Sequence, residues 1–379
     1  MLIIFSGTIG RSALGGQAWA TMQYLAGFRQ LGHDVFYLED CGETSLAYNW
    51  GRQEPTYDLD YPSEFVRECL RFLDMEDRWI YRAGDGWRGF TLSDFQDVCS
   101  EASLMIMRAT PMWTWRGEYA RPHRRAFIDV DPGFTQFRLA GGHRALSEGL
   151  DRCERLFTLG QNIGMQGCTI PTVNRQWLKT LPPVSLPHWP AQGDREDTHF
   201  TSLIRWTGYR EETFGGTTYG QRDMEFPKYL HLPQMVKQPL RMAAMGVAPE
   251  ILEANGWDFV RGEEVSRTHQ AYQRFIQRSR GEFLVPKHAY VSTRSGWFSD
   301  RSVCYLASGR PVLIEDTGLG GFLPLGNGLL TFSDPDSAAR GLDIINEDYG
   351  NHCNAARKLA EQLFSAETVL PAFLEAALA

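Results

Sequence analysis

The chain has 379 residues, 43% of them hydrophobic and 22% charged, which is typical of a folded globular protein and excludes a disordered, collagen-like or coiled-coil chain. This length is about twice that of a common single domain, so two domains are expected. The 46 acidic residues outnumber the 38 basic ones and give a net charge of −8, which argues against general binding to nucleic-acid phosphates.

The first half of the chain alternates short apolar runs with helical patterns. A buried strand is expected at residues 2–5, a helix over 17–31 and a second strand at 34–39. Further short apolar runs, each followed by loop residues, predict strands at 104–107, 126–130 and 155–159. Strands that alternate with helices in this way indicate a parallel, doubly wound α/β domain.

A proline-rich stretch divides the chain. Five prolines fall between residues 171 and 190, and the polar run 192–198 follows them. Because such segments typically connect domains, we expect an N-terminal domain at 1–180, a linker at 181–200 and a C-terminal domain at 201–360. In that second domain the pattern predicts strands at 200–206, 240–244, 257–260, 281–285, 310–314 and 328–332, with helices at 334–347 and 352–364.

The seven cysteines form no CxxC pair, and their number is odd. A structural zinc site or a disulfide framework is therefore not expected, and a reducing cytoplasm fits this cysteine usage. The apolar runs fall well short of the ~18 residues that a membrane span requires. We therefore expect a cytoplasmic protein without a membrane span.

Residues 292–318 carry the densest signal in the chain. Ser295–Gly296 forms a loop, Ser299 or Asp300 caps a following helix, and Gly309 ends that helix in a left-handed conformation. A helix that starts behind a loop of small residues presents unpaired N–H groups and the positive end of its dipole. This combination favours a diphosphate.

Two arginines flank this helix start. Arg294 and Arg301 would add charge-assisted contacts to phosphate oxygens. The alternative is that both are surface charges and that Ser299 is only a cap.

The helix continues into the pattern small-x-Gly-x-Pro-Val-Leu at residues 307–313, and this stretch resembles the signature in the C-terminal domain of GT-B-fold glycosyltransferases. The order of the segments that follow, an apolar run at 328–332, a helix start at 334–339 and a helical tail, also matches that family. The N-terminal unit resembles the acceptor domain of that family. The resemblance implies two Rossmann-like domains that face a cleft, with a tail at 361–379 that crosses back to the N-terminal domain. It also implies a nucleotide-diphosphate sugar, with UDP favoured, as co-substrate and no tightly bound cofactor.

The chain departs from this family at two positions. Cys304 and Gly296 stand where many members have glutamates, one of which normally holds the donor ribose. Asp300, Glu315 and Asp316 are the candidate substitutes. The departure leaves the subfamily, and retaining or inverting chemistry, open.

Other donor contacts are implied by the same resemblance. Gly15 and Gly16 would let backbone N–H groups approach the sugar or phosphate, although a plain β-to-α turn explains them equally well. Arg205, Thr207 and Tyr219 follow the first strand of the C-terminal domain and become candidate ligands. A surface hairpin is the alternative for residues 214–220. Lys287 or His288 would face the donor, or would be ordinary loop residues.

Asp129 and Asp131 lie where a buried strand ends, and extended alternation places both on one side. An inverting enzyme needs a base for the acceptor hydroxyl. We expect Asp131 to be that base, with Asp129 as its support or as a sugar ligand. Binding of a divalent metal by this pair is an alternative, although no metal is expected in this fold; capping of the next turn is another.

The acceptor is left open by the sequence. A small molecule, a lipid or a protein is expected, and a hydroxymethylated DNA base is possible because some viral DNA-glucosylating enzymes share this fold. The basic cluster 116–125 is the local support for DNA. A sugar-nucleotide epimerase and a non-catalytic nucleotide-sugar-binding protein are the functional alternatives.

Overall fold

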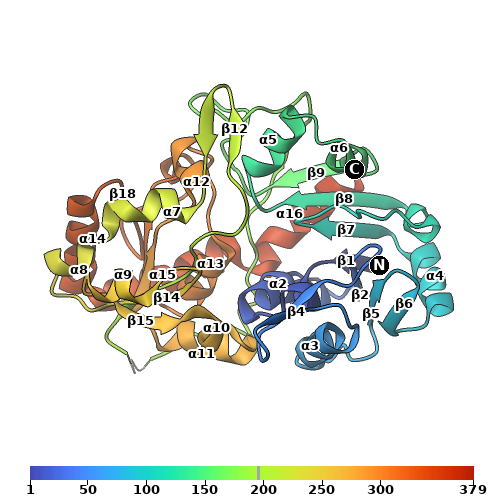
Figure 1. Cartoon of the computed structure of the whole chain (residues 1–379), viewed down its shortest axis with the longest axis horizontal. Helices are drawn as coiled ribbons and strands as arrows, with labels where there is room; N and C mark the ends of the chain where they lie inside the picture. Colours follow the sequence, from blue (N-terminus) through green and yellow to red (C-terminus); the bar gives the residue numbers. More distant parts are fainter. Residues whose placement is uncertain (194–196) are drawn as a thin grey trace.

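Two parallel sheets lie side by side in the computed structural model, which describes residues 1–193 and 197–379 (Figure 1). The N-terminal sheet has the order β10-β9-β8-β7-β1-β2-β5-β6, and only β6 runs antiparallel to its neighbour. Its strands are β1 (Leu2–Ser6), β2 (Asp34–Asp40), β5 (Trp79–Ala83), β6 (Gly86–Gly89), β7 (Leu104–Arg108), β8 (Arg124–Asp129), β9 (Arg155–Thr158) and β10 (Leu178–Lys179).

Helices and one small hairpin complete this unit. They are α1 (Ile9–Ser12), α2 (Gly15–Gln30), α3 (Asp60–Arg71), α4 (Leu92–Glu101), α5 (Phe134–Ala140), α6 (Arg144–Leu150), the short 3-10 helix Gly117–Ala120 and the strands β3 (Ala47–Asn49) and β4 (Glu54–Thr56). Central strands such as β1 are almost wholly apolar because helices cover both faces of the sheet. Helix α2 is buried over nearly its whole length, so it has no polar face.

The C-terminal sheet is entirely parallel, with the order β15-β14-β11-β16-β17-β18. Its strands are β11 (Phe200–Arg205), β14 (Leu240–Met245), β15 (Asp258–Arg261), β16 (Gly281–Leu284), β17 (Val312–Glu315) and β18 (Leu329–Phe332). Its helices are α7 (Arg222–Glu225), α8 (Leu232–Met235), α9 (Pro249–Glu253), α10 (Gly262–Ser266), α11 (His269–Arg278), α12 (His288–Ser292), α13 (Asp300–Ala307), α14 (Pro335–Glu347) and α15 (Tyr349–Leu359), with 3-10 turns at Phe226–Tyr229 and Leu319–Gly321.

The predicted fold class, two doubly wound sheets, is confirmed. The sequence analysis missed β5, whose Arg82 interrupts the apolar pattern. That guanidinium is buried and donates to Glu118 at 2.5 Å, so a polar residue sits inside the unit. Of the two interpretations of residues 214–220, the hairpin is correct: β12 (Glu212–Phe214) pairs with β13 (Thr217–Tyr219) through Gly215 and Gly216, both at positive φ.

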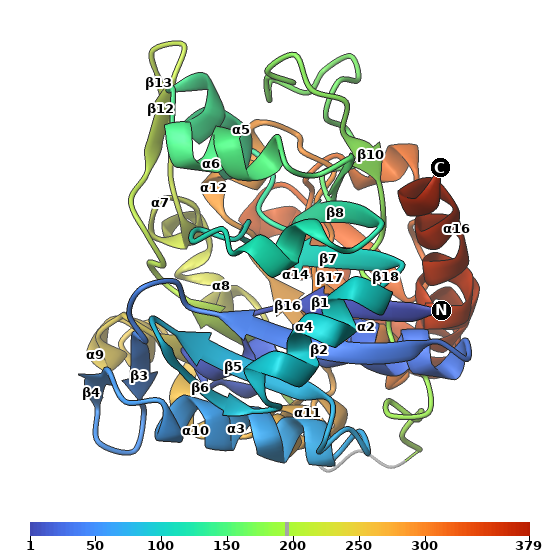
Figure 2. The same ribbon diagram turned by 90° about the vertical axis from the view of Figure 1, so that its right-hand side faces the viewer.

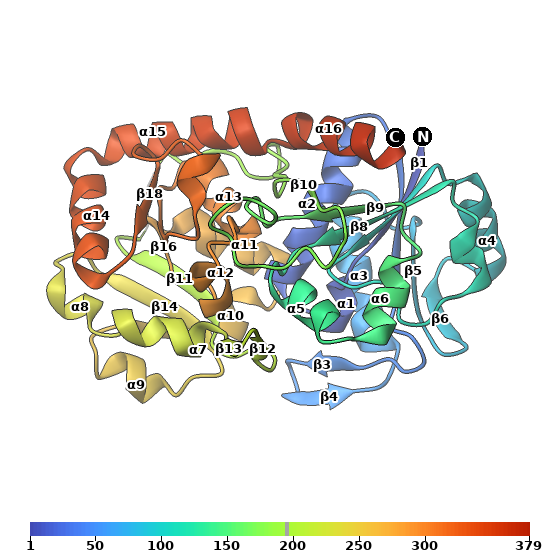
Figure 3. The same cartoon turned by 90° about the horizontal axis from the view of Figure 1, so that it is seen from above.

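The last helix, α16 (Ala366–Leu378), joins the two units. After a π-helical turn at Ala360–Phe364 it leaves the C-terminal unit and packs against α2, where a side chain on Gly27 would come within 2.6 Å of Ala366 (Figure 3). Val184 pairs with Ser365 at the same crossing. Figure 2 shows α16 beside the N-terminal sheet and the β12–β13 hairpin alongside α5.

The first part of the predicted linker is packed against the N-terminal unit. Trp189 is completely buried, and it meets Trp19 of α2 at 4.9 Å between ring centroids. Residues 194–196 of this linker lie outside the described residues. The domain boundaries themselves stay predictions. Nowhere in 1–193 or 197–379 is a helix long and apolar enough to cross a membrane.

Candidate active site

A cavity of about 790 Å³ lies between the two units, at the carboxyl ends of the strands of both sheets. Residues that follow β1, β7 and β8 line it from one unit, and residues at the ends of β11 and β14 line it from the other. Ligands of open α/β sheets bind at this edge, and the volume falls within the usual range for small-molecule sites.

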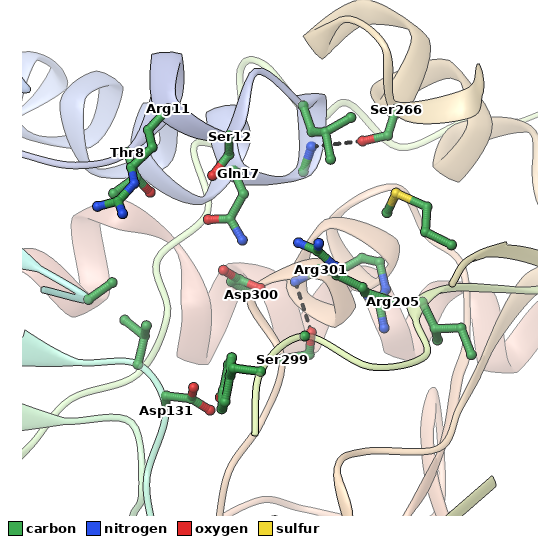
Figure 4. A pocket seen from close by; sticks show the side chains of 18 of the residues that line it. Thr8, Arg11, Ser12, Gln17, Asp131, Arg205, Ser266, Ser299, Asp300 and Arg301 are labelled. Atoms are coloured by element: carbon green, nitrogen blue, oxygen red, sulfur yellow. Dashed lines mark hydrogen bonds between the residues drawn. The ribbon is translucent and has the colours of Figure 1, made fainter. Parts of the chain in front are cut away.

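Helix α13 starts at the floor of this cavity. The Ser299 hydroxyl accepts a hydrogen bond from the Arg301 N–H at 3.1 Å, so Ser299 is the cap. Asp300 pairs with Arg108 from the end of β7 at 2.9 Å, which links the two units. Figure 4 shows Ser299, Asp300 and Arg301 around the space that Gln17 also enters from α2.

Cationic side chains predominate in the lining. Two carboxylates, Asp131 and Asp300, face six basic residues: Arg11, Arg108, Arg205, Arg222, Lys287 and Arg301. Arg11 interacts with the buried Glu39, whose pKa it lowers against the effect of burial. Burial, followed by repulsion from Arg301, lowers the pKa of Arg222 to about 10. This excess of positive charge suits an anionic ligand.

Two buried donors in the lining, Gln221 Nε2 and Arg301 Nη2, have no hydrogen-bond partner among residues 1–193 and 197–379. The Arg108 guanidinium, by contrast, interacts with the buried Tyr24 hydroxyl, whose pKa it lowers against the effect of burial. Gln221 is only 4% exposed. Because buried polar groups are nearly always hydrogen-bonded, the two unpartnered donors point to a ligand that brings acceptor oxygens.

Asp131 belongs to the N-terminal unit, and its side chain contacts the C-terminal unit. Its Oδ1 accepts from Lys287 Nζ at 2.7 Å and from the Tyr290 hydroxyl, both in the C-terminal unit. Lys287 also lies 4.4 Å from the ring centroid of Tyr209 and 5.1 Å from that of Phe134. Burial lowers the pKa of Lys287, and Asp131 opposes this effect. Lys287 lines the cavity, so it is not an ordinary surface-loop residue, and its contact with a donor stays a prediction.

Asp129 has a different environment from Asp131. It is fully buried and accepts from Thr135 at 2.7 Å, Thr158 at 2.8 Å and Gln136 at 2.9 Å, and also from the Asp131 N–H. Burial raises its pKa against these hydrogen bonds. The strand ends at Asp129, so the expected alternation does not extend to Asp131, and only Asp131 reaches the cavity. The contacts of Asp129 are those of a support for the loop.

The two glycines of the first loop differ in position. Gly16 lines the cavity, and its N–H donates to the Ser266 hydroxyl at 3.2 Å. Gly15 packs against α11, where an added Cβ would lie 2.7 Å from the Cβ of Tyr272. Close helix packing, rather than a ligand, accounts for Gly15.

Arg205 lines the cavity at the end of β11, whereas Thr207 and Tyr219 do not. Tyr219 stacks on Phe137 of α5 with ring centroids 4.3 Å apart. Glu212 of the same hairpin pairs with Arg138 at 2.7 Å. Residues 214–220, which the resemblance placed toward the donor, therefore form a hairpin that packs against α5 of the N-terminal unit.

The loop before α13 lines the cavity through Trp297 and Ser299, but not through the residues that the sequence analysis selected at 294–296. Ser295 is buried and its hydroxyl donates to the Tyr290 carbonyl at 3.1 Å, while a Cβ added to Gly296, which has φ +70°, would lie 2.9 Å from Asn162. The Arg294 side chain is 61% exposed and pairs with Asp316 at 3.7 Å. None of these three residues lines the cavity.

Of the three candidate substitutes for the family glutamate, only Asp300 lines the cavity. Asp316 accepts from the N–H groups of Gly318 at 2.8 Å and Leu319 at 3.0 Å. Glu315 is buried beside Tyr229 at 2.7 Å, and burial together with Glu225 raises its pKa.

The sequence analysis missed several lining residues. Arg108 is the last residue of the apolar strand β7. A charged residue at the carboxyl end of such a strand indicates a ligand-binding position and could have been found from the sequence. Gln221 and Arg222 follow the hairpin, and no pattern in their neighbourhood distinguishes them from ordinary turn residues. Within the described chain no three His, Cys, Asp or Glu side chains gather as a metal site.

The basic cluster 116–125 lies largely away from the cavity. Arg124 begins β8, whereas the cavity lies at the end of that strand, and Arg121 donates to the Gln96 carbonyl at 3.1 Å. Arg116 pairs with Asp40 at 2.8 Å, and Arg125 pairs with Glu154. The cluster therefore does not form a basic groove at the site.

Solved structures share this architecture over the whole chain. An α-glucosyltransferase in complex with UDP and a 13-mer DNA containing an HMU base superposes with a TM-score of 0.59 at 8% identity, covering 100% of both chains. HepE of Anabaena, in complex with UDP and glucose, gives 0.57 at 10% identity, and a sucrose-phosphate synthase of Thermosynechococcus elongatus gives 0.54 at 12%; each covers 99% of this chain and 98% of its own. No family model and no curated protein matches the sequence. The chain has the GT-B fold.

Proposed function

We propose that the protein is a glycosyltransferase that moves a sugar from a nucleotide-diphosphate sugar, with UDP as the favoured nucleotide, to an acceptor hydroxyl. The observation that carries this proposal is the pair of buried, unpartnered donors in the cavity lining, Gln221 Nε2 and Arg301 Nη2, the second of which lies in the first turn of α13. The full-length similarity to structures solved with UDP supports the choice of ligand.

The diphosphate takes the place where positive charge is concentrated. The N-terminus of α13 supplies N–H groups behind Ser299, and Arg301 and Arg205 flank it. Arg301 is held by the buried Glu282 at 2.6 Å, which fixes its direction. Charge that develops on the departing diphosphate is thus met by oriented donors, which is the main source of catalysis in such a site.

Asp131 is the acceptor-side carboxylate of this proposal. It lies on the loop after β8, where its backbone N–H donates to Asp129. It lines the cavity from the unit opposite α13. It serves as the base for the acceptor hydroxyl if the reaction inverts the anomeric centre. Lys287 and Tyr290 then orient its carboxylate.

A binding series tests the donor assignment. The full chain is titrated calorimetrically with UDP, ADP, GDP and UDP-glucose, and UDP and UDP-glucose are expected to bind with saturable affinity. Proton NMR of UDP-glucose incubated with the chain then distinguishes the reactions, because epimers have the same mass but different sugar-ring couplings. Slow release of glucose supports a transferase, whereas an epimerised nucleotide sugar supports the epimerase and an unchanged donor with tight binding supports a binding protein. No binding of any nucleotide diphosphate would refute the proposal.

DNA with a hydroxymethylated base is the second candidate acceptor, because several similar structures are α-glucosyltransferase complexes with DNA. Filter binding of such DNA at increasing salt tests it, since phosphate contacts make affinity fall steeply with salt. The position of the basic cluster gives this candidate no local support.

A further inference from the structure

The N-terminal wall of the cavity is aromatic, in contrast to the cationic floor at α13. Tyr48 and Trp50 from the β3–β4 region and Trp113 from the loop after β7 line it, together with Leu46. Trp113 is 45% exposed and Leu46 is 44% exposed. Large apolar side chains exposed inside a binding cavity are typical of a ligand contact.

Contacts within the protein hold these rings in place. The Trp50 indole N–H donates to the Ser12 carbonyl at 3.0 Å, and its ring lies 4.5 Å from that of Tyr48. Trp113 packs on His143 with ring centroids 6.1 Å apart. A wall fixed in this way loses little side-chain entropy when a ligand stacks on it.

Neutral polar groups accompany the aromatic wall. The hydroxyls of Thr8, Ser12 and Thr110 and the amide of Gln17 line the same side of the cavity. Figure 4 shows Thr8, Ser12 and Gln17 together on this side, across from Ser299. Flat apolar rings beside hydroxyl and amide groups match a sugar ring, which has an apolar C–H face and a polar rim of hydroxyls.

The segment that carries the aromatic residues adds no positive charge to this side of the cavity. Residues 43–60 contain four carboxylates, Glu43, Glu54, Asp58 and Asp60, and a single cation, Arg52. Arg11 and Arg108 are the cations that line the N-terminal side, and Arg108 is paired with Asp300. The described residues of this wall therefore do not form the row of cations that would follow a nucleic-acid backbone.

We propose that the acceptor is a neutral carbohydrate whose ring stacks on the wall formed by Tyr48, Trp50 and Trp113. This inference rests on the proposed glycosyltransferase function and specifies its acceptor. The sugar ring lies against the aromatic wall, its hydroxyls contact the neutral polar groups, and one hydroxyl points toward Asp131 and the donor.

A panel of acceptors tests the proposal with UDP-glucose as donor. It contains methyl and phenyl pyranosides, glycerol as a hydroxyl compound without a ring, glucose 6-phosphate, and duplex DNA with a hydroxymethylated base. We expect kcat/KM to be at least about tenfold higher for a neutral pyranoside than for glycerol or the DNA. Preferred transfer to the DNA, to the phosphorylated sugar or to glycerol would overturn the proposal.

Ligand-observed NMR decides the case in which no acceptor is glycosylated. Saturation transfer to the ring protons of a methyl pyranoside in the presence of UDP supports the proposal, and its absence while UDP binds refutes it. Failure of UDP itself to bind refutes the proposed function instead, so the two failures are distinguishable.

Variants locate the effect on the wall. Trp113→Ala is expected to raise the KM for the pyranoside about tenfold or more, while the dissociation constant of UDP changes less than twofold. Trp87→Ala is the matched control, because Trp87 is 38% exposed on β6 and does not line the cavity. An unchanged KM in Trp113→Ala, or an equal rise in both variants, would contradict stacking on this wall.

Discussion

Lys287 and Asp131 meet across the two halves of the molecule, with Nζ of one 2.7 Å from Oδ1 of the other. The rings of Phe134, Tyr209 and Tyr290 surround the lysine and leave its side chain 14% exposed, whereas the Asp131 side chain is 25% exposed at the cavity. The contact joins the loop after β8 to the segment before α12 and places a carboxylate at the cavity. Asp131 is thereby both part of the interface between the units and the candidate base.

Replacing Asp131 separates these two roles. Asp131→Asn keeps the shape and the hydrogen bond from Tyr290 but removes the proton acceptor, so we expect kcat to fall by about 100-fold or more, with the affinity for UDP nearly unchanged. Steady-state kinetics and calorimetry measure the two quantities. Asp336→Asn, at an exposed position on α14, is the control. Unaltered kcat in Asp131→Asn would exclude Asp131 as the base.

Arg205 and Arg294 are both candidate donor contacts from the sequence, but substitutions at the two positions are expected to affect UDP binding differently. Arg205 lines the cavity, and Arg205→Ala should weaken UDP binding about tenfold or more through loss of a charge-assisted contact. Arg294 is exposed and pairs with Asp316 outside the cavity, so Arg294→Ala should change the affinity less than twofold. Calorimetric titration of both variants checks the pair, and equal effects would contradict the placement of the diphosphate.

Stability should depend on pH through Glu39. This buried carboxyl accepts from the N–H groups of Gly10 at 2.8 Å and Arg11 at 2.7 Å, and burial raises its pKa from 4.5 to about 7 against the effect of Tyr37 and these bonds. The unfolded chain releases the proton near pH 4.5, whereas the folded chain retains it to about pH 7. The free energy of unfolding is therefore expected to fall between these pH values, by roughly 3 kcal/mol from this group.

Urea unfolding at a series of pH values measures this dependence. Glu39→Gln should show a shallower decline between pH 4.5 and 7, because it removes one of the buried carboxyls that titrate there, while Glu315, whose pKa is raised to about 9, still contributes. Glu43→Gln, at an exposed position in the loop after β2, is the control and should keep the same pH dependence as the wild type. An identical slope in wild type and Glu39→Gln would show that Glu39 does not titrate in this range.

The β12–β13 hairpin is expected to hold the two units together. Tyr219 is 7% exposed and stacks on Phe137, so Tyr219→Ala should lower the free energy of unfolding by about 3 kcal/mol and increase the radius of gyration in solution scattering. Tyr57→Ala, at a side chain 66% exposed, should leave both unchanged. A destabilised variant with an unaltered radius would assign Tyr219 to local packing alone.

The sequence predicted most strands because both faces of each central strand are covered, which makes them continuous apolar runs such as β1 and β16. It also predicted the cap at Ser299, since cap chemistry is local. It missed β5 and the burial of Arg82, because the partner Glu118 lies 36 residues away and leaves no local pattern.

The candidate site shows the same division. The sequence by itself determined two parallel sheets, a helix start suited to an anion, and the loop that carries Asp131. Only the tertiary structure decided which polar residues face the cavity: it placed Gln221, Arg222 and Lys287 there and left Thr207, Tyr219 and Arg294 outside. The physical reason is that a strand or a cap is set by neighbouring residues, whereas the walls of a cleft between two domains are set by how the domains pack.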